Sequence, residues 1–353
     1  NTCWNLINFR KTLISKLLKK NKVVVIANTD KYSRNLKRMG CQVYDPSIES
    51  RSTSIFKEIN LLIKYYKLIS KLKPHMVLSF TIKPNIYSSI CCNFLKIKNI
   101  CNITGLGVGF QSSNYLKFLL TFLFKISIKN CNKIFFQNLD DLKYFKRNKI
   151  INKDYELIPG SGIKIKKIKK EYKKKNNNLN FLYVGRIIRD KGIIELIKAF
   201  LKLVKNNNKI TLTLVGEKEG DLSKQILNNK NKFIKIVKFS NNIQKYYLKA
   251  DYFIFPSHRE GMSNALLQAG LYKLPIICSN VPGNRDLIKD NINGFLFRPN
   301  SSKSIYVSMK RVIRTRSAKL NNMKLKLYNK IKNEYNEQII IKKYLKTIDQ
   351  LKS

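Results

Sequence analysis

The chain has 353 residues, which corresponds to about two domains at roughly 150 residues each. Hydrophobic residues make up 44% of it and aromatic residues 11%, which excludes a wholly disordered protein. The formal net charge of +49 is typical of proteins that bind nucleic acid or an anionic membrane. Of the 70 basic residues only 13 are Arg, and the 57 Lys are spread along the chain with Ile and Asn. Because phosphate-binding sites concentrate Arg, this even spread favours compositional drift over a nucleic-acid-binding surface.

The cysteine and histidine content narrows the class of protein further. Seven Cys without a C-x-x-C pair predict neither a disulfide framework nor a zinc site, and indicate a reducing cytoplasm. Two His are too few for a His-rich metal centre. No uninterrupted apolar stretch reaches about 18 residues and no signal peptide is visible, so we expect a cytoplasmic protein without a transmembrane helix.

Short apolar runs alternate with helical patterns in both halves of the chain. In the first half we predict buried strands at Lys22–Ala27, Met76–Phe80, Asn99–Ile103 and Lys133–Gln137, and helices at Ser54–Leu72 and Pro84–Leu95. In the second half we predict strands at Phe181–Val184, Ile210–Val215, Phe233–Val237, Tyr252–Phe255 and Pro275–Cys278, and helices at Lys191–Val204, Ile243–Leu248, Asn264–Tyr272 and Asn284–Ile288. Two such alternations predict an α/β fold of two domains with parallel sheets that face each other across a cleft.

A highly charged tract, Lys164–Asn180, separates the two halves. It is followed directly by a strand and is poor in apolar residues, so we interpret it as a solvated linker or surface helix. The alternative is a basic anchor to anionic lipid. The predicted domains are residues 1–165 and 166–330, and residues 331–353 form a C-terminal helix that can cross back to the first domain.

Polar and glycine residues follow one predicted strand of the second half at Gly185-Arg186 and Lys191-Gly192. Ligands of parallel α/β sheets bind beyond the carboxyl ends of the strands. Gly185 allows a sharp turn there, and Arg186 and Lys191 are placed where both can reach one anionic group beside a helix N-terminus. This arrangement suits a diphosphate, although an ordinary helix start with solvated cations has the same pattern.

A second loop follows Tyr252–Phe255 and contains Glu260, Gly261, Met262 and Ser263 before a predicted helix. The amides at a helix start lack partners and suit a phosphate or a sugar hydroxyl, and Gly261 lets a ligand approach them. A carboxylate beside an anion site is explained if Glu260 accepts hydrogen bonds from hydroxyls. The pattern therefore predicts a nucleotide-sugar site.

These motifs resemble family-4 retaining glycosyltransferases of the GT-B fold, in particular the bacterial subgroup that builds polysaccharide on lipid carriers. The matching stretches of the second half are Gly185–Gly192, Ala250–Gly261, Leu274–Ile277 and Val281–Asp286. Those of the first half are Trp4–Arg10, Thr81–Tyr87, Ile103–Gly107, Phe136–Asp141 and Pro159–Gly162. The resemblance implies that the first domain carries the acceptor side, that the second binds the nucleotide sugar, and that the first strand and its glycine loop precede Asn1.

The resemblance also implies roles for residues of the second half. Arg186 and Lys191 correspond to the pair that neutralises the donor diphosphate, and Glu260 to the first acid of the E-x7-E motif, near the transferred sugar. Gly261, Met262 and Ser263 correspond to the amides that hold hydroxyls and phosphate. The second acid, expected on the nucleotide ribose, is replaced by Gln268, which can bond a hydroxyl only without charge assistance.

On the acceptor side the family often uses a His near the donor sugar. His75 precedes its predicted strand and does not fill that role, and we interpret His258 as a packing residue. Residues that follow two predicted strands of the first half are the substitutes. They are Thr81, Lys83 and Asn85 after the strand at Met76–Phe80, and Gly105 and Gly107 after the strand at Asn99–Ile103.

The predicted activity is transfer of a sugar, hexose or N-acetylhexosamine, from a nucleotide sugar (UDP favoured) to a glycan or a polyprenyl-diphosphate-linked acceptor. By resemblance the reaction retains anomeric configuration and needs no metal or other cofactor. An apolar segment with spaced lysines, Tyr115–Ile128, predicts either a buried helix or one that docks on an anionic membrane at the inner face of the cell membrane. The alternatives are a nucleotide-sugar epimerase on the same fold and a basic nucleic-acid-binding protein, though we expect no nucleic-acid partner.

Overall fold

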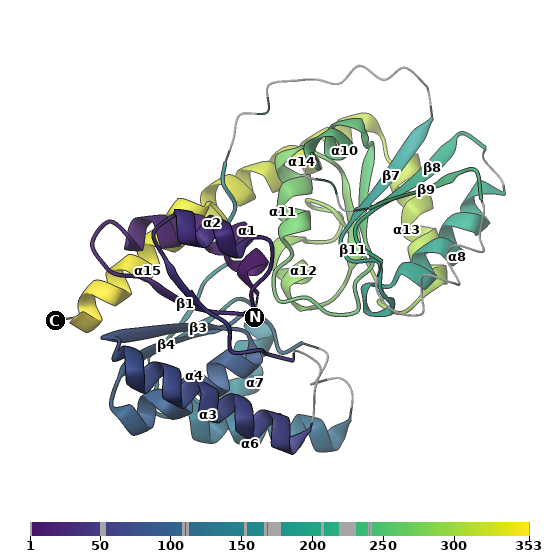
Figure 1. Cartoon of the computed structure of the whole chain (residues 1–353). Helices are drawn as coiled ribbons and strands as arrows, with labels where there is room; N and C mark the ends of the chain where they lie inside the picture. Colours follow the sequence, from purple (N-terminus) through teal and green to yellow (C-terminus); the bar gives the residue numbers. More distant parts are fainter. Residues whose placement is uncertain are drawn as a thin grey trace. The chain divides into compact units, whose positions relative to one another are not determined.

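The structure is a computed structural model that describes residues 2–49, 54–107, 110, 113–151, 154–165, 168, 178–205, 208–218, 231–238, 240 and 242–352. The chain forms two compact units (Figure 1). Unit 1 comprises Asn1–Ser161 and Gln338–Ser353, and unit 2 comprises Gly162–Glu337. Among the helices of the described ranges, none has both the length and the apolar character needed to cross a membrane.

Unit 1 contains two parallel sheets. Strands β1 (Val24–Ile26) and β2 (Gln42–Tyr44) form one, and β3 (Met76–Phe80), β4 (Lys98–Ile103), β5 (Lys133–Phe136) and β6 (Tyr155–Leu157) form the other in that order. The four strands predicted in this half are present. Strands β2 and β6 were not predicted, because three residues that include a polar one carry too short a pattern to recognise.

Helices cover both faces of the larger sheet of unit 1. In the described ranges the helices of the unit are α1 (Cys3–Leu17), α2 (Ser33–Arg38), α3 (Ile55–Leu72), α4 (Ile82–Leu95), α6 (Asn114–Ser127), α7 (Leu139–Arg147) and α15 (Glu337–Lys352). Side chains alternate along the strands, so that Cys101 and Phe136 pack toward α3, α4 and α6, whereas Ile100 and Phe135 pack toward α1 and α15. The C-terminal helix therefore belongs to the core of unit 1, with Tyr344 against Phe135 at a centroid distance of 4.8 Å.

Unit 2 is built on a six-stranded parallel sheet in the order β12-β11-β10-β7-β8-β9. The strands are β7 (Leu179–Val184), β8 (Ile210–Val215), β9 (Ile234–Val237), β10 (Tyr252–Phe255), β11 (Ile276–Ser279) and β12 (Phe295–Phe297). The helices are α8 (Ile193–Val204), α10 (Gln244–Lys249), α11 (Asn264–Leu271), α12 (Pro282–Leu287), α13 (Ser302–Arg314) and α14 (Ser317–Glu334), and a 3₁₀ turn, η1, spans Arg189–Lys191. The five strands predicted here are present, and among the strands that the structure describes in this unit only the short edge strand β12 was not predicted.

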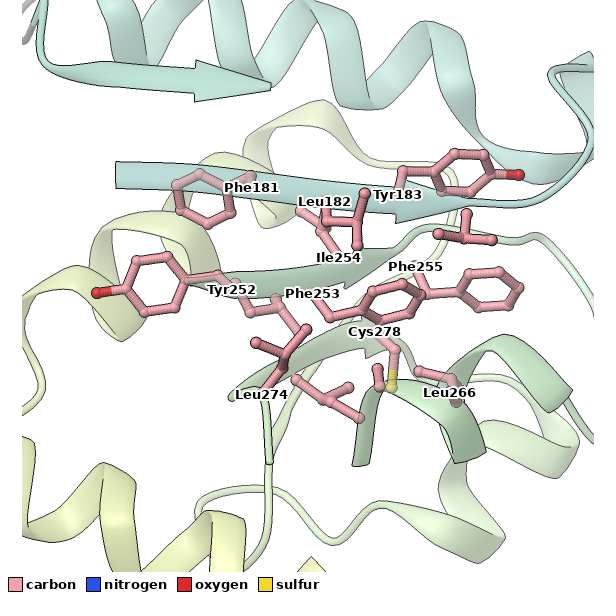
Figure 2. Packing of buried hydrophobic residues seen from close by; sticks show 14 of the residues in the cluster. Phe181, Leu182, Tyr183, Tyr252, Phe253, Ile254, Phe255, Leu266, Leu274 and Cys278 are labelled. Atoms are coloured by element: carbon pink, nitrogen blue, oxygen red, sulfur yellow. The ribbon is translucent and has the colours of Figure 1, made fainter. Parts of the chain in front are cut away.

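In the two central strands of unit 2, Phe181–Val184 of β7 and all of β10 are apolar and buried, because both faces of these strands are covered there. Their rings stack across the pair, Phe181 on Tyr252 and Tyr183 on Phe255, at 4.9 and 5.9 Å between centroids (Figure 2). The predicted α/β fold with parallel sheets is confirmed in both units. Most of the charged tract Lys164–Asn180 lies outside the described residues, so its predicted role as a linker or anchor stays a prediction.

Candidate active site

The strand order of unit 2 places a crevice at the ends of its two central strands. From β7 the chain continues outward to β8 and β9, and then returns to β10 on the other side of β7 before it moves on to β11 and β12. At such a switch point the loops after two neighbouring strands run in opposite directions and leave a crevice between them. Ligands of open α/β sheets bind in this crevice. The loops after β7 and β10 are the two that carry the predicted donor-site residues.

The first of these loops turns at Gly185. A Cβ at this position would lie 2.6 Å from the Tyr183 hydroxyl, so only glycine leaves room for that side chain. The hydroxyl donates a hydrogen bond to the Arg186 carbonyl oxygen at 2.8 Å and thereby ties the turn to the core. Burial, followed by the nearby Glu260 carboxylate, raises the pKa of Tyr183 well above its ordinary value, so the hydroxyl stays a donor. The Arg186 side chain is exposed at the surface of this turn.

The first loop ends at Gly192, where η1 passes into α8. Gly192 has a φ of 67°, and a Cβ there would lie 2.2 Å from the Pro256 carbonyl oxygen of the second loop. The His258 amide donates to the Asp190 carbonyl oxygen at 3.0 Å and joins the same two loops a second time. The backbones of the two loops are thus in direct contact, which a larger residue at Gly192 would prevent.

The second loop packs against the segment that follows β11. A Cβ at Gly283 would lie 1.9 Å from the Gly261 carbonyl oxygen, so α12 begins directly against this loop. Ser263 forms the N-cap of α11, and its side chain accepts a hydrogen bond from the Leu266 amide. Within the described ranges the amides of Gly261, Met262 and Ser263 donate no hydrogen bond. Three backbone donors therefore remain for a ligand at this helix start.

An ion pair between Lys191 and Glu260 links the side chains of the two loops. The Lys191 ammonium forms a short ion pair with Glu260 Oε1, and their side chains are only 19% and 13% exposed. The Lys191 Nζ also lies 5.9 Å from the centre of the Phe255 ring. The sequence predicted both residues for the donor site but not this contact, because they stand far apart in the chain. An anionic ligand at the switch point has to compete with Glu260 for the Lys191 ammonium.

Two further residues of interest belong to the second loop and its helix. Gln268 is partly buried on α11, two turns after Glu260 as the motif requires. His258 Nε2 lies 3.6 Å from Glu195 Oε2 at the start of α8, and both atoms are buried without a hydrogen-bond partner in the described part of the chain. His258 thus packs between the loops, which agrees with its interpretation as a packing residue.

The acceptor-side candidates of unit 1 lie at the carboxyl ends of β3 and β4. Thr81 caps α4 with a φ of 71°, an uncommon backbone conformation for a residue with a side chain. Gly105 and Gly107 have φ values of 136° and 63°, and the loop between them is held by the Leu106 amide, which donates to the buried Asp141 carboxylate at 3.2 Å. Thr81, Gly105 and Gly107 thus share one edge of the sheet.

The other two acceptor-side candidates have structural contacts. Asn85 is 1% exposed, and its side chain accepts from the Ser79 hydroxyl at 2.7 Å and donates to the Asn102 carbonyl oxygen at 2.8 Å. Lys83 forms an ion pair with Glu58 at 2.5 Å and donates to the Glu49 carbonyl oxygen. The Asn85 amide therefore satisfies buried polar groups of β3 and β4, and its predicted acceptor-side role stays a prediction. Lys83 joins α4 to α3.

Sequence reasoning gave no role to three residues that shape these edges: Tyr183, Gly283 and Asp141. Asp141 alone had a local signal, since Asn138 three residues earlier predicts a helix cap, and its side chain accepts from the Asp141 amide at 2.8 Å. The sequence pattern at Tyr183 is that of an ordinary core aromatic residue, and the close approach of Gly283 depends on Gly261, a residue of another loop.

Two family models match the chain. Residues 164–333 match "Glycosyl transferases group 1", and residues 7–138 match "Glycosyl transferase 4-like". The chain is a glycosyltransferase. Its two models correspond to unit 2 and unit 1, and between them they leave only short segments unmatched.

Relatives of this glycosyltransferase support the same class. The capsular polysaccharide biosynthesis glycosyltransferase CapM of Staphylococcus aureus is 26% identical over 346 residues, which cover 93% of this chain and 90% of CapM. The N,N'-diacetylbacillosaminyl-diphospho-undecaprenol alpha-1,3-N-acetylgalactosaminyltransferase of Campylobacter jejuni is 23% identical, covering 98% of this chain and 96% of that enzyme. Both are transferases, so the comparisons favour transfer over the epimerase and nucleic-acid alternatives.

A solved structure shows the same fold. The crystal structure of Anabaena Alr3699/HepE in complex with UDP-glucose superposes with a TM-score of 0.77 at 14% identity, covering 96% of this chain and 94% of that one. The predicted GT-B fold of the glycosyltransferase is thereby confirmed.

Proposed function

We propose that this glycosyltransferase transfers a sugar from a UDP-sugar to a polyprenyl-diphosphate-linked acceptor in the synthesis of a surface polysaccharide. The observation that carries the donor side is the meeting of Lys191, Glu260 and three open amides at the switch point of unit 2. The acceptor class is supported by the Campylobacter relative, whose name specifies a diphospho-undecaprenol-linked substrate.

In this proposal the cations of the first loop bind the leaving group. As the bond between the anomeric carbon and the β-phosphate oxygen breaks, negative charge grows on the diphosphate, and Arg186, Lys191 and the amides of Met262 and Ser263 stabilise it. Lys191 exchanges its contact with Glu260 for the diphosphate. The released carboxylate of Glu260 then accepts hydrogen bonds from hydroxyls of the transferred sugar, and Gln268 bonds the ribose.

The transfer step is proposed to retain configuration. The acceptor hydroxyl oxygen bonds to the anomeric carbon on the face from which the diphosphate leaves, and its proton passes to a departing phosphate oxygen. Because protein cations neutralise the diphosphate, we expect activity to persist in the presence of EDTA. Thr81, Gly105 and Gly107 are the proposed acceptor-side positions, and the reaction is proposed to occur at the inner face of the cell membrane without a nucleic-acid partner.

A donor panel tests this function. UDP-, GDP- and ADP-sugars are incubated with the enzyme and an undecaprenyl-diphosphate-linked sugar, and both nucleotide release and glycolipid product are measured. We expect acceptor-dependent release from a UDP-sugar, unchanged by EDTA and lost in Glu260→Ala. Formation of an isomeric nucleotide sugar without acceptor, or the absence of release from every donor, would refute the proposal.

A further inference from the structure

Helix α3 carries an apolar stripe on its solvent side. Ile55, Phe56, Ile59, Ile63 and Tyr66 are 72%, 86%, 52%, 46% and 45% exposed. Their spacing places them on one face of the helix, while Leu61, Tyr65 and Ile69 fill the opposite, buried face. A helix of a globular unit needs only one apolar face, so the second stripe on α3 has no role in the core of unit 1.

Helix α6 repeats the arrangement. Tyr115, Phe118, Leu119, Phe122 and Ile126 are 76%, 71%, 37%, 52% and 49% exposed. Steps of three and four residues again align them in one stripe, and the buried Phe124 and Ser127 point to the core. The sequence suggested either a buried helix or a lipid-docking helix for this segment. The structure shows a helix that is buried on one side and apolar on the other as well.

The two stripes belong to one layer of helices. Helix α4 packs against both α3 and α6, and all three lie on the same side of the strands β3 and β4 (Figure 1). Helix α4 is almost completely buried, and its one strongly exposed apolar side chain is Phe94, at 78%. All three helices of this layer therefore carry large exposed apolar side chains. We call the stripes of α3 and α6 together with Phe94 the α3–α6 face.

Lysines lie on both helices, with Lys67 and Lys125 next to the stripes and the Lys117 ammonium over the Tyr144 ring. Helices α3 and α6 carry six lysines and one glutamate, and that glutamate, Glu58, is bonded to Lys83 and Tyr87. The exposed lysines of these two helices are Lys57, Lys67 and Lys71 on α3, of which Lys57 is paired with Glu49, and Lys117 and Lys125 on α6. Large apolar and aromatic side chains flanked by lysines are the composition of helices that lie in the interface of an anionic bilayer. A second copy of this chain would instead bring two positively charged faces together.

We propose that the α3–α6 face docks unit 1 on an anionic lipid bilayer, with the aromatic and aliphatic side chains inserted among the acyl chains and the lysines at the headgroups. Neither helix is long and apolar enough to cross a bilayer, and both lie flat within the helical layer, as interfacial binding requires. The inference builds on the proposed lipid-linked acceptor, since docking would bring the enzyme to the surface that holds such a substrate.

Vesicle sedimentation tests the face directly. Wild-type enzyme should sediment with phosphatidylglycerol-rich vesicles and much less with pure phosphatidylcholine. The apolar test variant is the triple Phe56→Ser, Phe118→Ser, Phe122→Ser, and its matched control is Ile292→Ser, Val307→Ser, Leu325→Ser, three side chains of unit 2 with 55%, 55% and 50% exposure. We expect the test variant to lose about a hundredfold in partitioning, as three partly inserted rings imply, and the control to lose none.

A charge variant and a fluorescence reporter complete the test. The charge test variant is Lys67→Gln, Lys71→Gln, Lys117→Gln, Lys125→Gln, and its control is Lys303→Gln, Lys319→Gln, Lys326→Gln, Lys332→Gln on exposed positions of unit 2. The charge test variant should lose the preference for anionic vesicles, and its control should keep it. With Trp4→Phe as background, Phe118→Trp should shift its emission to the blue when vesicles are added.

The outcomes separate docking from catalysis. The apolar test variant should transfer sugar to a water-soluble acceptor analogue at the wild-type rate, which also shows that it is folded. If it still sediments like the wild type, or if its control is impaired equally, the α3–α6 face is not the docking surface. If neither the wild type nor the apolar test variant transfers sugar to the soluble analogue, but vesicle binding follows the expected pattern, the proposed reaction is refuted and the docking inference stands.

Discussion

The ion pair between Lys191 and Glu260 leads to a prediction in which two substitutions change donor binding in opposite directions. Lys191→Met removes the ammonium and keeps most of the apolar stem, whereas Glu260→Gln removes the carboxylate charge and keeps the shape. If Glu260 competes with a diphosphate for Lys191, the first variant should bind UDP more weakly and the second should bind it more tightly than the wild type. A purely structural ion pair would give no such opposition.

The magnitudes follow from the burial of the pair. With side chains 19% and 13% exposed, it lies between a surface pair, worth at most about 1 kcal/mol, and a fully buried one, whose disruption costs about 3–5 kcal/mol. We therefore expect each single variant to lose about 1–2 kcal/mol in the free energy of unfolding, and the double variant less than their sum. One lost charge-assisted bond of about 1.5–3 kcal/mol should weaken UDP binding by Lys191→Met roughly tenfold to a hundredfold.

Titration calorimetry with UDP measures both dissociation constants, and urea unfolding measures the stability cycle. Glu260→Gln should strengthen UDP binding by up to about tenfold, since Lys191 no longer exchanges partners, while kcat with the complete donor falls. Arg189→Met removes an exposed cation from the same turn and serves as the control, with UDP affinity near the wild type. Wild-type UDP affinity in Lys191→Met, or weakened binding in Glu260→Gln, would refute the reasoning.

Three further substitutions follow from the packing. Tyr183→Phe removes the donor to the Arg186 carbonyl, so about 1 kcal/mol of stability should be lost and the donor KM should rise more than kcat falls; an unchanged KM would show that the turn does not need this tie. Gly192→Ala should cost at least about 2 kcal/mol in urea unfolding, more than Gly107→Ala, because both have a φ near 65° but only Gly192 meets a backbone oxygen, at 2.2 Å against 3.5 Å to an Ile82 methyl group. Asn85→Ala should lower stability by about 1–3 kcal/mol and leave the acceptor KM of the folded enzyme unchanged; a raised KM without loss of stability would return Asn85 to the acceptor side.

Much of the fold could be predicted because its signals are local. Strands such as Met76–Phe80 and Tyr252–Phe255 were predicted with the observed bounds, since a short run rich in apolar residues marks a strand, and Tyr252–Phe255 is buried along its whole length. The donor loops were predicted for the same reason, because each follows directly after such a strand. Short edge strands such as β12 escaped, since three residues carry no period.

The limits of sequence reasoning are clearest at Asn85, Lys83 and the α3 stripe. Asn85 follows a strand, as a ligand-binding residue would, yet its amide satisfies buried groups of β3 and β4. The apolar residues of α3 predicted a helix correctly, but the pattern did not reveal that two faces are apolar and only one is covered. Which face meets the core depends on the neighbouring helix, and that is a tertiary property.

The sequence by itself determined the α/β class, the two donor loops and their chemistry, because strand patterns, glycines and charges are written in consecutive residues. Only the tertiary structure decided how those residues act together. It placed Lys191 against Glu260 and Gly192 against Pro256, because both contacts join loops that the strand order brings side by side at one switch point. The tertiary structure also placed some of the many lysines on the same helices as exposed apolar side chains. Packing decides this, because it determines which side chains of a helix face solvent.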